Sequence, residues 1–413
     1  MHILLCNYEY PPLGGGGGIF TAHLARHLAK HHEVTVLTSL ALGMPLDSVE
    51  GGVRVIRVPV FLRQHRATAS LVSMASYIFN GVREGKKLLL RQSFDVINTH
   101  FALPSGPVGD ALSRFGNIPN VLTVHGGDIY DPSKFSSPHR HPLLKTWTRH
   151  LLYRADKIVG QSNDTLDNMH KYYASDLDAT LIPLGIEPPP LVSAQECNYQ
   201  FGEDEVLLIT VGRLVPRKAS GQLITMMKGI KGARARLIII GCGPEEKALK
   251  AEVKSSGLGE RVLFTGYISD EDKFRLLQRS DIYVSTSQHE GFGLVFLEAM
   301  ASGLPIVCYN HGGQTDFLQN HRNGYLLPLN DLDGVRERCR QLVESAELRK
   351  SIGDVNERYV NQFYIHNCAS LYEDVFQEAI SQFSEKAAEK VNAYKGATKP
   401  GRFTHPVGVR RRR

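Results

Sequence analysis

Residues 281–310, "DIYVSTSQHEGFGLVFLEAMASGLPIVCYN", decide the fold that this sequence predicts. Two apolar segments rich in β-branched residues, 281–287 and 305–310, enclose a stretch that is helical in pattern from about Gly293. Strands that are apolar along their whole length are typical of a parallel sheet that is buried on both faces. The order strand, helix, strand therefore predicts one βαβ unit.

The same alternation extends over most of the chain. Apolar, strand-like segments recur at 2–7, 33–39, 53–60, 95–100, 120–126, 157–162 and 179–185, and again at 205–212, 235–243, 262–268, 281–287, 305–310 and 324–329. Repeated βα units predict an α/β fold with two Rossmann-like, doubly wound parallel-sheet domains that face a cleft. Ligands of such sheets bind beyond the carboxyl ends of the strands, so functional residues are expected there.

A proline-rich, polar stretch divides the chain. With 413 residues the chain is long enough for two domains, and the strand pattern stops at Pro188 and resumes at Glu205. We therefore predict an N-terminal domain at 1–187, a linker at 188–204, a C-terminal domain at 205–362, a helix at 363–383 that packs back on the N-terminal domain, and a basic, disordered tail at 384–413.

Composition favours a globular protein in a reducing compartment. Hydrophobic residues make up 42% and charged residues 22%, and the net charge is +6. The six cysteines form no C-x-x-C pair, which argues against a metal site or a disulfide framework. Because the sequence shows neither a signal-peptide pattern nor an apolar run of ~20 residues, we expect a cytoplasmic protein that can lie at the inner face of a membrane.

Two acidic residues flank the start of the helix that is predicted within residues 281–310. Glu290 lies in the loop after the strand, and Glu298 lies on the helix, with seven residues between them. Gly291 and Gly293 let a ligand approach the backbone amides at a helix N-terminus, which is a favourable seat for a diphosphate. Glu290 could then accept hydrogen bonds from sugar hydroxyls and Glu298 from a ribose. The alternative is that both acids only complement the helix start.

A second candidate element, "TVGRLVPRK" at 210–218, follows the first strand of the C-terminal domain. Gly212 permits a tight turn, and Arg213 and Lys218 can converge on a phosphate. The alternative is a pair of surface cations.

The N-terminal domain offers two glycine-rich segments. In "YPPLGGGGGIFTAH", at 10–23, five glycines precede a helical pattern at 19–30. This stretch could cradle a phosphate, serve as a flexible linker or form a tightly packed turn. In "HGGD", at 125–128, His125 ends a strand and is an active-site candidate, with His100 and Asp128 as further acceptor-side candidates.

These motifs together resemble those of the retaining glycosyltransferases of family 4, which have the GT-B fold. The resemblance rests on "PPLGGGGG", "TVHGGD", "VGRLVPRK" and "EGFGLVFLEAMASGLPIV", and it covers all but about the last thirty residues. It implies that His125, Arg213, Lys218 and Glu290 are catalytic. It implies donor contacts at Gly15, Gly16, Gly212, Arg213, Lys218, Tyr267, Ile268, Glu290, Gly291, Phe292, Gly293, Leu294 and Glu298, and acceptor-side positions at Gly16 and His125. The other glycines of the loop are expected to add mobility.

The sequence departs from the family pattern at three places. "GGQTD" ends in Asp316 where the family usually has glutamate, "PLGIE" has Leu184 where asparagine is usual, and "RKAS" lacks the glycine that commonly follows the lysine. None of these changes removes a side chain to which the resemblance assigns a role at the active site.

The resemblance implies transfer of a hexose from a nucleotide-sugar, UDP before GDP, to a hydroxyl of a glycan, a lipid-linked or a small-molecule acceptor. We expect no cofactor, no metal ion and no nucleic acid partner. The basic and apolar segment 61–92 could contact an anionic membrane or pack as an ordinary amphipathic helix. Alternatives are a sugar-nucleotide epimerase and a non-catalytic binding protein. A dehydrogenase is disfavoured because the first strand is not followed directly by G-x-G-x-x-G and the second ends without an acid.

Overall fold

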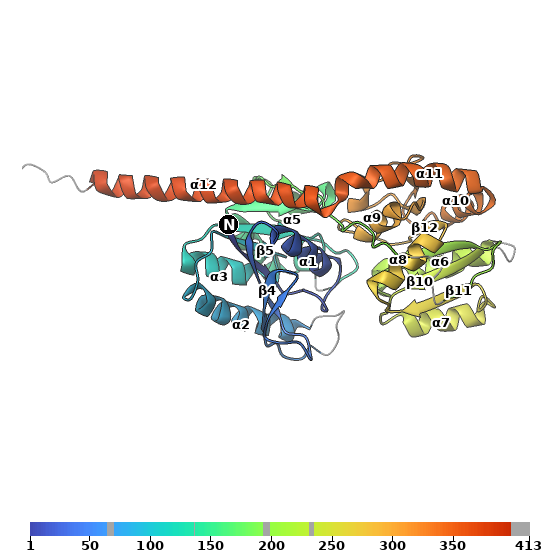
Figure 1. Ribbon diagram of the computed structural model, residues 1–413, viewed down its shortest axis with the longest axis horizontal. Helices are drawn as coiled ribbons and strands as arrows, with labels where there is room; N and C mark the ends of the chain where they lie inside the picture. The colour runs from blue at the N-terminus through green and yellow to red at the C-terminus, as the bar shows by residue number, and fades with distance from the viewer. Residues whose placement is uncertain (64–69, 136, 193–198, 231–234, 398–413) are drawn as a thin grey trace, which may run out of the picture.

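The computed structural model describes residues 1–63, 70–135, 137–192, 199–230 and 235–397. It contains two α/β domains side by side, with a long C-terminal helix that runs from one domain across the other (Figure 1). The prediction of two parallel-sheet domains is confirmed.

The N-terminal sheet has eight strands in the order β3-β4-β2-β1-β5-β6-β7-β8. All neighbours are parallel except β3, which pairs antiparallel with β4. The strands are β1 (His2–Asn7), β2 (Glu33–Ser39), β3 (Asp47–Glu50), β4 (Val53–Val58), β5 (Val96–His100), β6 (Asn120–Val124), β7 (Lys157–Gly160) and β8 (Thr180–Leu181). Strands β1, β5 and β6 lie in the middle of the sheet, so their carboxyl ends meet at one edge.

Successive residues of β1 point to opposite faces, and helices cover both. Ile3 and Leu5 belong to the same apolar cluster as Phe20 of α1 (Gly16–Leu28) and Phe376 of α12 (Ile365–Ala397). On the other face, Leu4 packs in a cluster with residues of α2 (Leu71–Leu89) and α3 (Gly106–Gly116). Helices α4 (Pro142–Arg154) and α5 (Asn163–Tyr172) and the short 3-10 helix η1 (Pro138–Arg140) complete the domain.

The C-terminal sheet has six parallel strands in the order β11-β10-β9-β12-β13-β14. They are β9 (Val206–Val211), β10 (Ala235–Ile240), β11 (Val262–Gly266), β12 (Ile282–Val284), β13 (Ile306–Tyr309) and β14 (Gly324–Leu327). Its helices are η3 (Pro216–Lys218), α6 (Ser220–Gly229), α7 (Glu246–Ser255), α8 (Asp270–Arg279), α9 (Leu294–Ala301), η4 (Gly313–Asp316), α10 (Leu332–Glu344), α11 (Ala346–Tyr359) and η5 (Val360–Phe363). The order reverses between β9 and β12, so the loops after these strands border the crevice of a doubly wound sheet.

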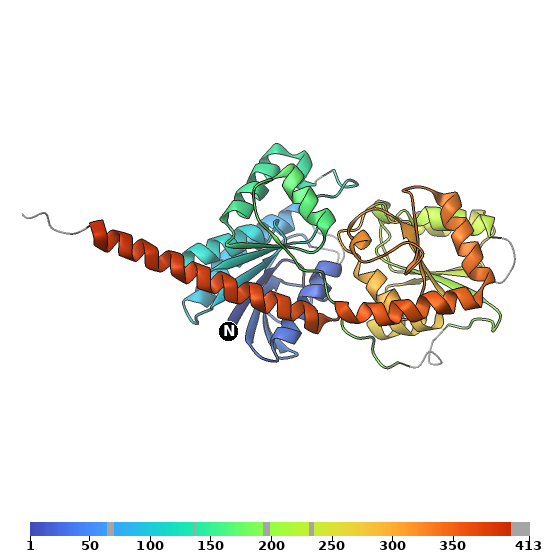
Figure 2. The ribbon, with the colours of Figure 1, turned by 90° about the horizontal axis from the view of Figure 1, so that it is seen from above.

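The chain crosses between the domains twice, and the two crossings touch. The amide of Ile186 donates to the carbonyl of Phe363 at 3.0 Å, and the amide of Ile365 donates back to Ile186 at 2.8 Å. Helix α12 then returns over the N-terminal sheet (Figure 2), where Glu373 lies 3.0 Å from His32. Residues 193–198 of the predicted linker lie outside the described residues.

The C-terminal helix is longer than predicted. Helix α12 continues to Ala397, so the expectation of a disordered tail from 384 is wrong for residues 384–397. Residues 398–413 lie outside the described part of the chain.

Candidate active site

The two domains touch through the segments that follow β6 and β7 in one sheet and β12 and β13 in the other. Ser162, at the start of α5, donates from Oγ to the carbonyl of Gly291 at 2.7 Å. The amide of Asn163 donates to Asp316 Oδ2 at 2.7 Å. A Cβ on Gly126 would lie 2.7 Å from Cα of Gly291, so glycines are needed where the backbones meet. The predicted site residues of both domains therefore face one another across this contact.

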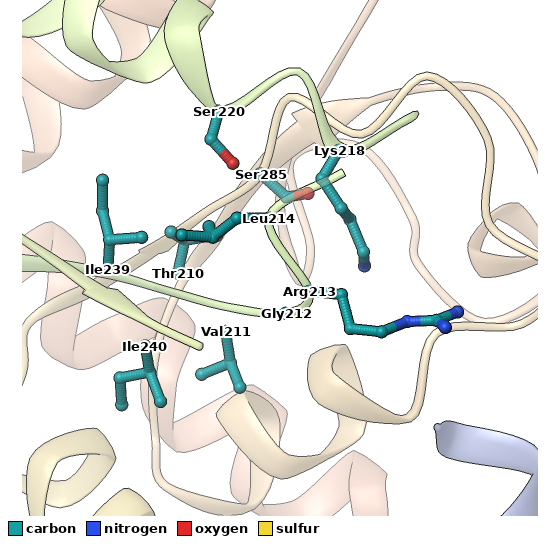
Figure 3. A pocket seen from close by; sticks show the side chains of 10 residues that line it. All are labelled: Thr210, Val211, Gly212, Arg213, Leu214, Lys218, Ser220, Ile239, Ile240 and Ser285. Carbon is teal, nitrogen blue, oxygen red and sulfur yellow. The ribbon is translucent and has the colours of Figure 1, made fainter. Parts of the chain in front are cut away.

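Arg213 and Lys218 lie in the loop after β9, as the sequence predicted. They line one pocket together with Gly212, Ser220 and Ser285. Figure 3 shows both side chains projecting from this loop, away from Ile239 and Ile240 of β10. The loop therefore presents two cations at the edge of the sheet.

Glu290 is buried beside Lys218 and Arg217 and is held in its ionised form. Its Oε1 accepts from Nζ of Lys218, and its Oε2 accepts from Nη1 of Arg217 at 3.1 Å. Burial alone would raise the pKa of Glu290, but Lys218 and Arg217 outweigh it and lower the pKa to about 2. Burial also lowers the pKa of Lys218, against the opposing effect of Glu290.

Arg217 is a site residue that the sequence reasoning missed. Besides Glu290 it contacts the carbonyl of His289 through Nη1, and its Nε lies 3.8 Å from Asp131 Oδ2 of the N-terminal domain. The signal was present as the third cation in "TVGRLVPRK", but sequence alone does not show that this side chain turns inward.

The start of α9 has the form expected of an anion seat. Its N-cap is Gly293 with φ +97°, a residue that has no side chain with which to cap the helix. Phe292 is buried with its ring 4.9 Å from that of Phe317, so its side chain anchors the loop instead of facing a ligand. The backbone amides of Phe292–Leu294 remain the groups that could bind phosphate oxygens.

Glu298 lies on α9 with one carboxylate oxygen engaged. Oε1 accepts from Nζ of Lys273 on α8 at 2.8 Å. Oε2 is buried and has no hydrogen-bond partner within the described residues. Burial raises the pKa of Glu298, and Lys273 opposes this. A hydroxyl donor would satisfy the Oε2 atom, which agrees with the predicted ribose contact. After β11, Tyr267 is 80% exposed and Ile268 is half-buried.

His125 and His100 form a buried, neutral pair at the ends of β6 and β5. Nδ1 of His100 lies 2.9 Å from Nε2 of His125, and Nδ1 of His125 lies 3.2 Å from Gln161 Oε1. Burial lowers the pKa of His125 to about 4 and that of His100 well below its usual range. An amide oxygen can only accept, so we assign the His125 proton to Nδ1, which leaves Nε2 to accept from His100.

Asp128 has a supporting position in this loop. Its two carboxylate oxygens accept from the amides of His125 at 2.8 Å and Ala102 at 2.6 Å. Burial raises the pKa of Asp128 to about 6. The carboxylate thus joins the loops after β5 and β6, and we expect it to shape the acceptor side without touching the acceptor.

The five glycines divide into two groups. Helix α1 begins at Gly16, three residues earlier than its apolar pattern indicates. A Cβ on Gly15 would lie 3.7 Å from Arg213 Cζ, and one on Gly16 would lie 3.7 Å from Leu294 Cδ1. These two positions thus face the C-terminal domain.

Backbone conformation or close packing favours glycine at each of the other three positions. Gly14 has φ +96°. A Cβ on Gly17 would overlap the Phe101 ring, and one on Gly18 would lie 3.1 Å from the carbonyl oxygen of Glu9.

Two departures from the family pattern have visible consequences. Asp316 accepts from the first amide of α5 across the domain interface, so a carboxylate at this position caps a helix of the other domain. Ala219, which stands where the family commonly has glycine, has φ +46° and ψ 38°. This left-handed conformation costs an alanine ~1–2 kcal/mol, whereas glycine adopts it freely.

Comparisons with known proteins agree with this architecture. Residues 14–188 match the model of "Glycosyltransferase Family 4", and residues 194–358 match that of "Glycosyl transferases group 1". The N-acetyl-alpha-D-glucosaminyl L-malate synthase of Bacillus anthracis is 26% identical over 90% of this chain and 96% of its own.

Solved structures share the fold. Sucrose-phosphate synthase from Thermosynechococcus elongatus superimposes with a TM-score of 0.81, at 21% identity, over 92% of this chain and 99% of its own. Anabaena HepE in complex with UDP gives a TM-score of 0.70 at 18% identity, over 92% of this chain and all of its own. Two family models that together cover most of the chain, the GT-B arrangement of its domains and the position of its motifs lead to one conclusion: this protein belongs to glycosyltransferase family 4 and is a glycosyltransferase.

Proposed function

We propose that the enzyme transfers a hexose, with retention of configuration, from a nucleotide-sugar bound mainly to the C-terminal domain. The observation that carries this proposal is the convergence of Arg213 and Lys218 on the strand edge that also holds Glu290. Two cations beside an uncapped helix N-terminus suit a diphosphate, and a carboxylate next to them suits sugar hydroxyls. UDP is our first choice of nucleotide and GDP the second.

In the proposed reaction, the bond between the sugar C1 and the phosphate oxygen breaks through an oxocarbenium-like state. Arg213, Lys218 and the first amides of α9 stabilise the departing diphosphate. The acceptor hydroxyl attacks C1 from the same face, and its proton passes to the leaving phosphate.

A double displacement would need a free nucleophile on the opposite face of the sugar. Asp128 is engaged by two amides, and Asp131 by Ser133, Lys134 and Arg217. Nε2 of His125 is engaged by His100. These contacts support attack on the same face, and we assign His125 the role of orienting the donor sugar.

A thermal-shift screen with UDP, GDP and ADP and their hexose derivatives tests the donor site. A ligand that binds only the folded protein at a hundredfold excess over its Kd stabilises it by about 2.7 kcal/mol. We expect one nucleotide to raise the unfolding temperature of the wild type and of the surface variant Arg340→Ala, and to raise that of Arg213→Ala much less. A flat response to every nucleotide would disprove the donor site, and sugar conversion without an acceptor would identify an epimerase instead.

For the acceptor we propose a hydroxyl compound that enters over the N-terminal domain. The class stays open among glycans, lipid-linked sugars and small molecules, the last of which agrees with the malate in the name of the Bacillus relative.

We further propose that the N-terminal domain contacts an anionic membrane through α2, consistent with a cytoplasmic enzyme at the inner membrane face. One stripe of α2 is exposed, with Leu71 and Val72 at its start, Phe79 near its middle, and Arg83 and Lys87 nearer its end. The loop before α2 adds the exposed Phe61 and Leu62 and is tied to the helix by hydrogen bonds. Residues 64–69 of this segment lie outside the described residues. No helix in the described ranges is long and apolar enough to cross a bilayer.

Co-sedimentation with vesicles tests this contact. We expect binding to vesicles that contain phosphatidylglycerol, and weaker binding for a Phe79→Ser/Arg83→Gln variant. Binding that does not depend on the anionic lipid content would contradict the proposal.

A further inference from the structure

Four charged side chains form a chain that crosses the domain interface. From the C-terminal domain, Lys218 and Arg217 hold the two oxygens of Glu290. From the N-terminal domain, Asp131 lies 3.8 Å from Arg217 Nε. All four side chains are largely buried, with side-chain exposures of 16%, 17%, 8% and 3% for Lys218, Arg217, Glu290 and Asp131. Their formal charges cancel within the chain.

Two anionic groups compete for the ammonium group of Lys218. In the structure its ammonium group pairs with Glu290. Under the proposed function the same group binds the donor diphosphate, which draws it away from the carboxylate. A buried carboxylate that loses its partner is strongly destabilised or takes up a proton. A protonated Glu290 would lose the charge with which it accepts strong hydrogen bonds from sugar hydroxyls.

Arg217 is placed to resolve this competition. It binds Oε2 of Glu290, the oxygen that Lys218 does not use. A second contact, to the carbonyl of His289, fixes its guanidinium next to Glu290. Its Nε faces Asp131, whose Oδ1 is itself fixed by the amide of Ser133 at 3.0 Å. Arginine stays charged at all relevant pH values, and its fork can hold several acceptors at once.

We propose that Arg217 is a positioning residue that keeps Glu290 ionised and oriented when Lys218 engages the donor, and that Asp131 links this support to closure of the two domains. The inference rests on the proposed function, because it concerns the same donor site. It predicts that nucleotide binding and sugar transfer respond differently to changes in this chain of charges.

The surroundings of Glu290 indicate which measurement is sensitive to Arg217. Within the part of the chain that the structure describes, His289, Tyr283 and Cys308 also interact electrostatically with Glu290. Burial lowers the pKa of His289 to about 4 and raises the pKa values of Tyr283 and Cys308, so all three are neutral at pH 7. Lys218 and Arg217 are therefore the cations that set the ionisation of Glu290, and loss of one should raise its pKa.

The experiment compares Arg217→Gln, Arg217→Lys and Asp131→Asn with the wild type and with the surface control Arg340→Gln. The rate of UDP release from UDP-glucose in water is followed from pH 3 to 9, because the pKa of Glu290 is about 2 in the intact site, and UDP affinity is measured by calorimetry. Arg217→Gln should lower kcat about tenfold and move the acid limb of its pH profile upward by ~1 unit, with UDP affinity within threefold of wild type. Arg217→Lys should restore the acid limb, because it restores the charge. Asp131→Asn should lower kcat severalfold with the acid limb unchanged.

An Arg217→Gln enzyme with the acid limb and the kcat of the wild type would overturn the inference and leave the proposed function intact. A fall in UDP affinity as large as the fall in kcat would also overturn the inference, since Arg217 would then act on the nucleotide directly. If Arg217→Gln fails to fold, Asp131→Asn decides: loss of kcat at constant UDP affinity supports the inference, and wild-type kcat overturns it. A wild type that binds none of UDP, GDP and ADP, and releases none of them from its glucose derivative, would instead overturn the proposed function.

Discussion

The two glycine-rich helix starts, at α1 and at α9, are built alike and are charged differently. Each begins at an uncapped glycine, Gly15 or Gly293, and each has a glutamate in the preceding loop. In the N-terminal domain Glu9 turns back and accepts from the amide of Gly15 at 3.0 Å. In the C-terminal domain Glu290 is engaged by Lys218 and Arg217.

This difference indicates which domain binds the donor and which one completes the site. A helix start with cations beside it can hold a diphosphate, whereas a helix start whose carboxylate is used internally offers mainly backbone and close approach. Gly15 faces Arg213 from the opposite side of the interface. We therefore expect α9 to bind the donor and α1 to complete the site when the domains meet.

The largest effect is expected from Arg213→Ala. Loss of this cation should reduce kcat on the order of 10²-fold or more, because the leaving diphosphate loses a charged partner. Steady-state rates for the variant and for Arg340→Ala, a surface control on α10, give the comparison. A rate within a few-fold of wild type would contradict the view that the cations beside α9, unlike the start of α1, stabilise the leaving diphosphate.

Gly16→Val should affect the other helix start. A Cβ at this position already contacts Leu294, so branched methyl groups would hold the domains apart. We expect transfer to fall about tenfold, as for other losses of alignment, while UDP binding stays near the wild-type level. Calorimetry and rate measurements on one preparation separate the two. Equal loss of both would mean that α1 binds the nucleotide itself.

The sequence predicted the repeated elements well because each βα unit carries its own local signal. For the same reason it placed Arg213, Lys218 and Glu290 after the correct strands and Glu298 on the helix that follows. It could not predict the contact between Arg217 and Asp131, since this pair joins loops of different domains. It also missed the end of α12: residues 384–397 are polar, which suggested disorder, yet they are mostly good helix formers without proline.

A smaller effect on stability is expected from two residues with positive φ, one in each domain. Gly14→Ala should cost about 1–3 kcal/mol, because φ is +96° and the new methyl group would lie 2.5 Å from Glu9 Oε2. Ala219→Gly, with φ +46°, should have the opposite sign and gain about 0.5–1 kcal/mol. Thermal unfolding of both variants measures the change in stability that each substitution causes. A lower unfolding temperature for Ala219→Gly would show that the alanine methyl group contributes more by contact than it costs in strain.

The smallest effect, none, is expected from removal of divalent cations. If Arg213, Lys218 and the α9 amides neutralise the leaving diphosphate, transfer should proceed in excess EDTA at the rate seen with Mg²⁺. Rates before and after exhaustive chelation test this, and a collapse in EDTA would show that the cations of the C-terminal domain do not suffice.

Because helix α12 is synthesised last, it determines when the N-terminal domain can finish folding. It is the last element of the chain, yet it packs on α1 and on β5 and β6 of the domain that is made first. Its Tyr372 ring stacks over His100 with ring centroids 6.4 Å apart. The N-terminal domain is therefore discontinuous in the gene, and on the ribosome one face of its central strands stays uncovered until the chain is nearly complete. A chain that stops before Ile365 would expose this apolar face to solvent.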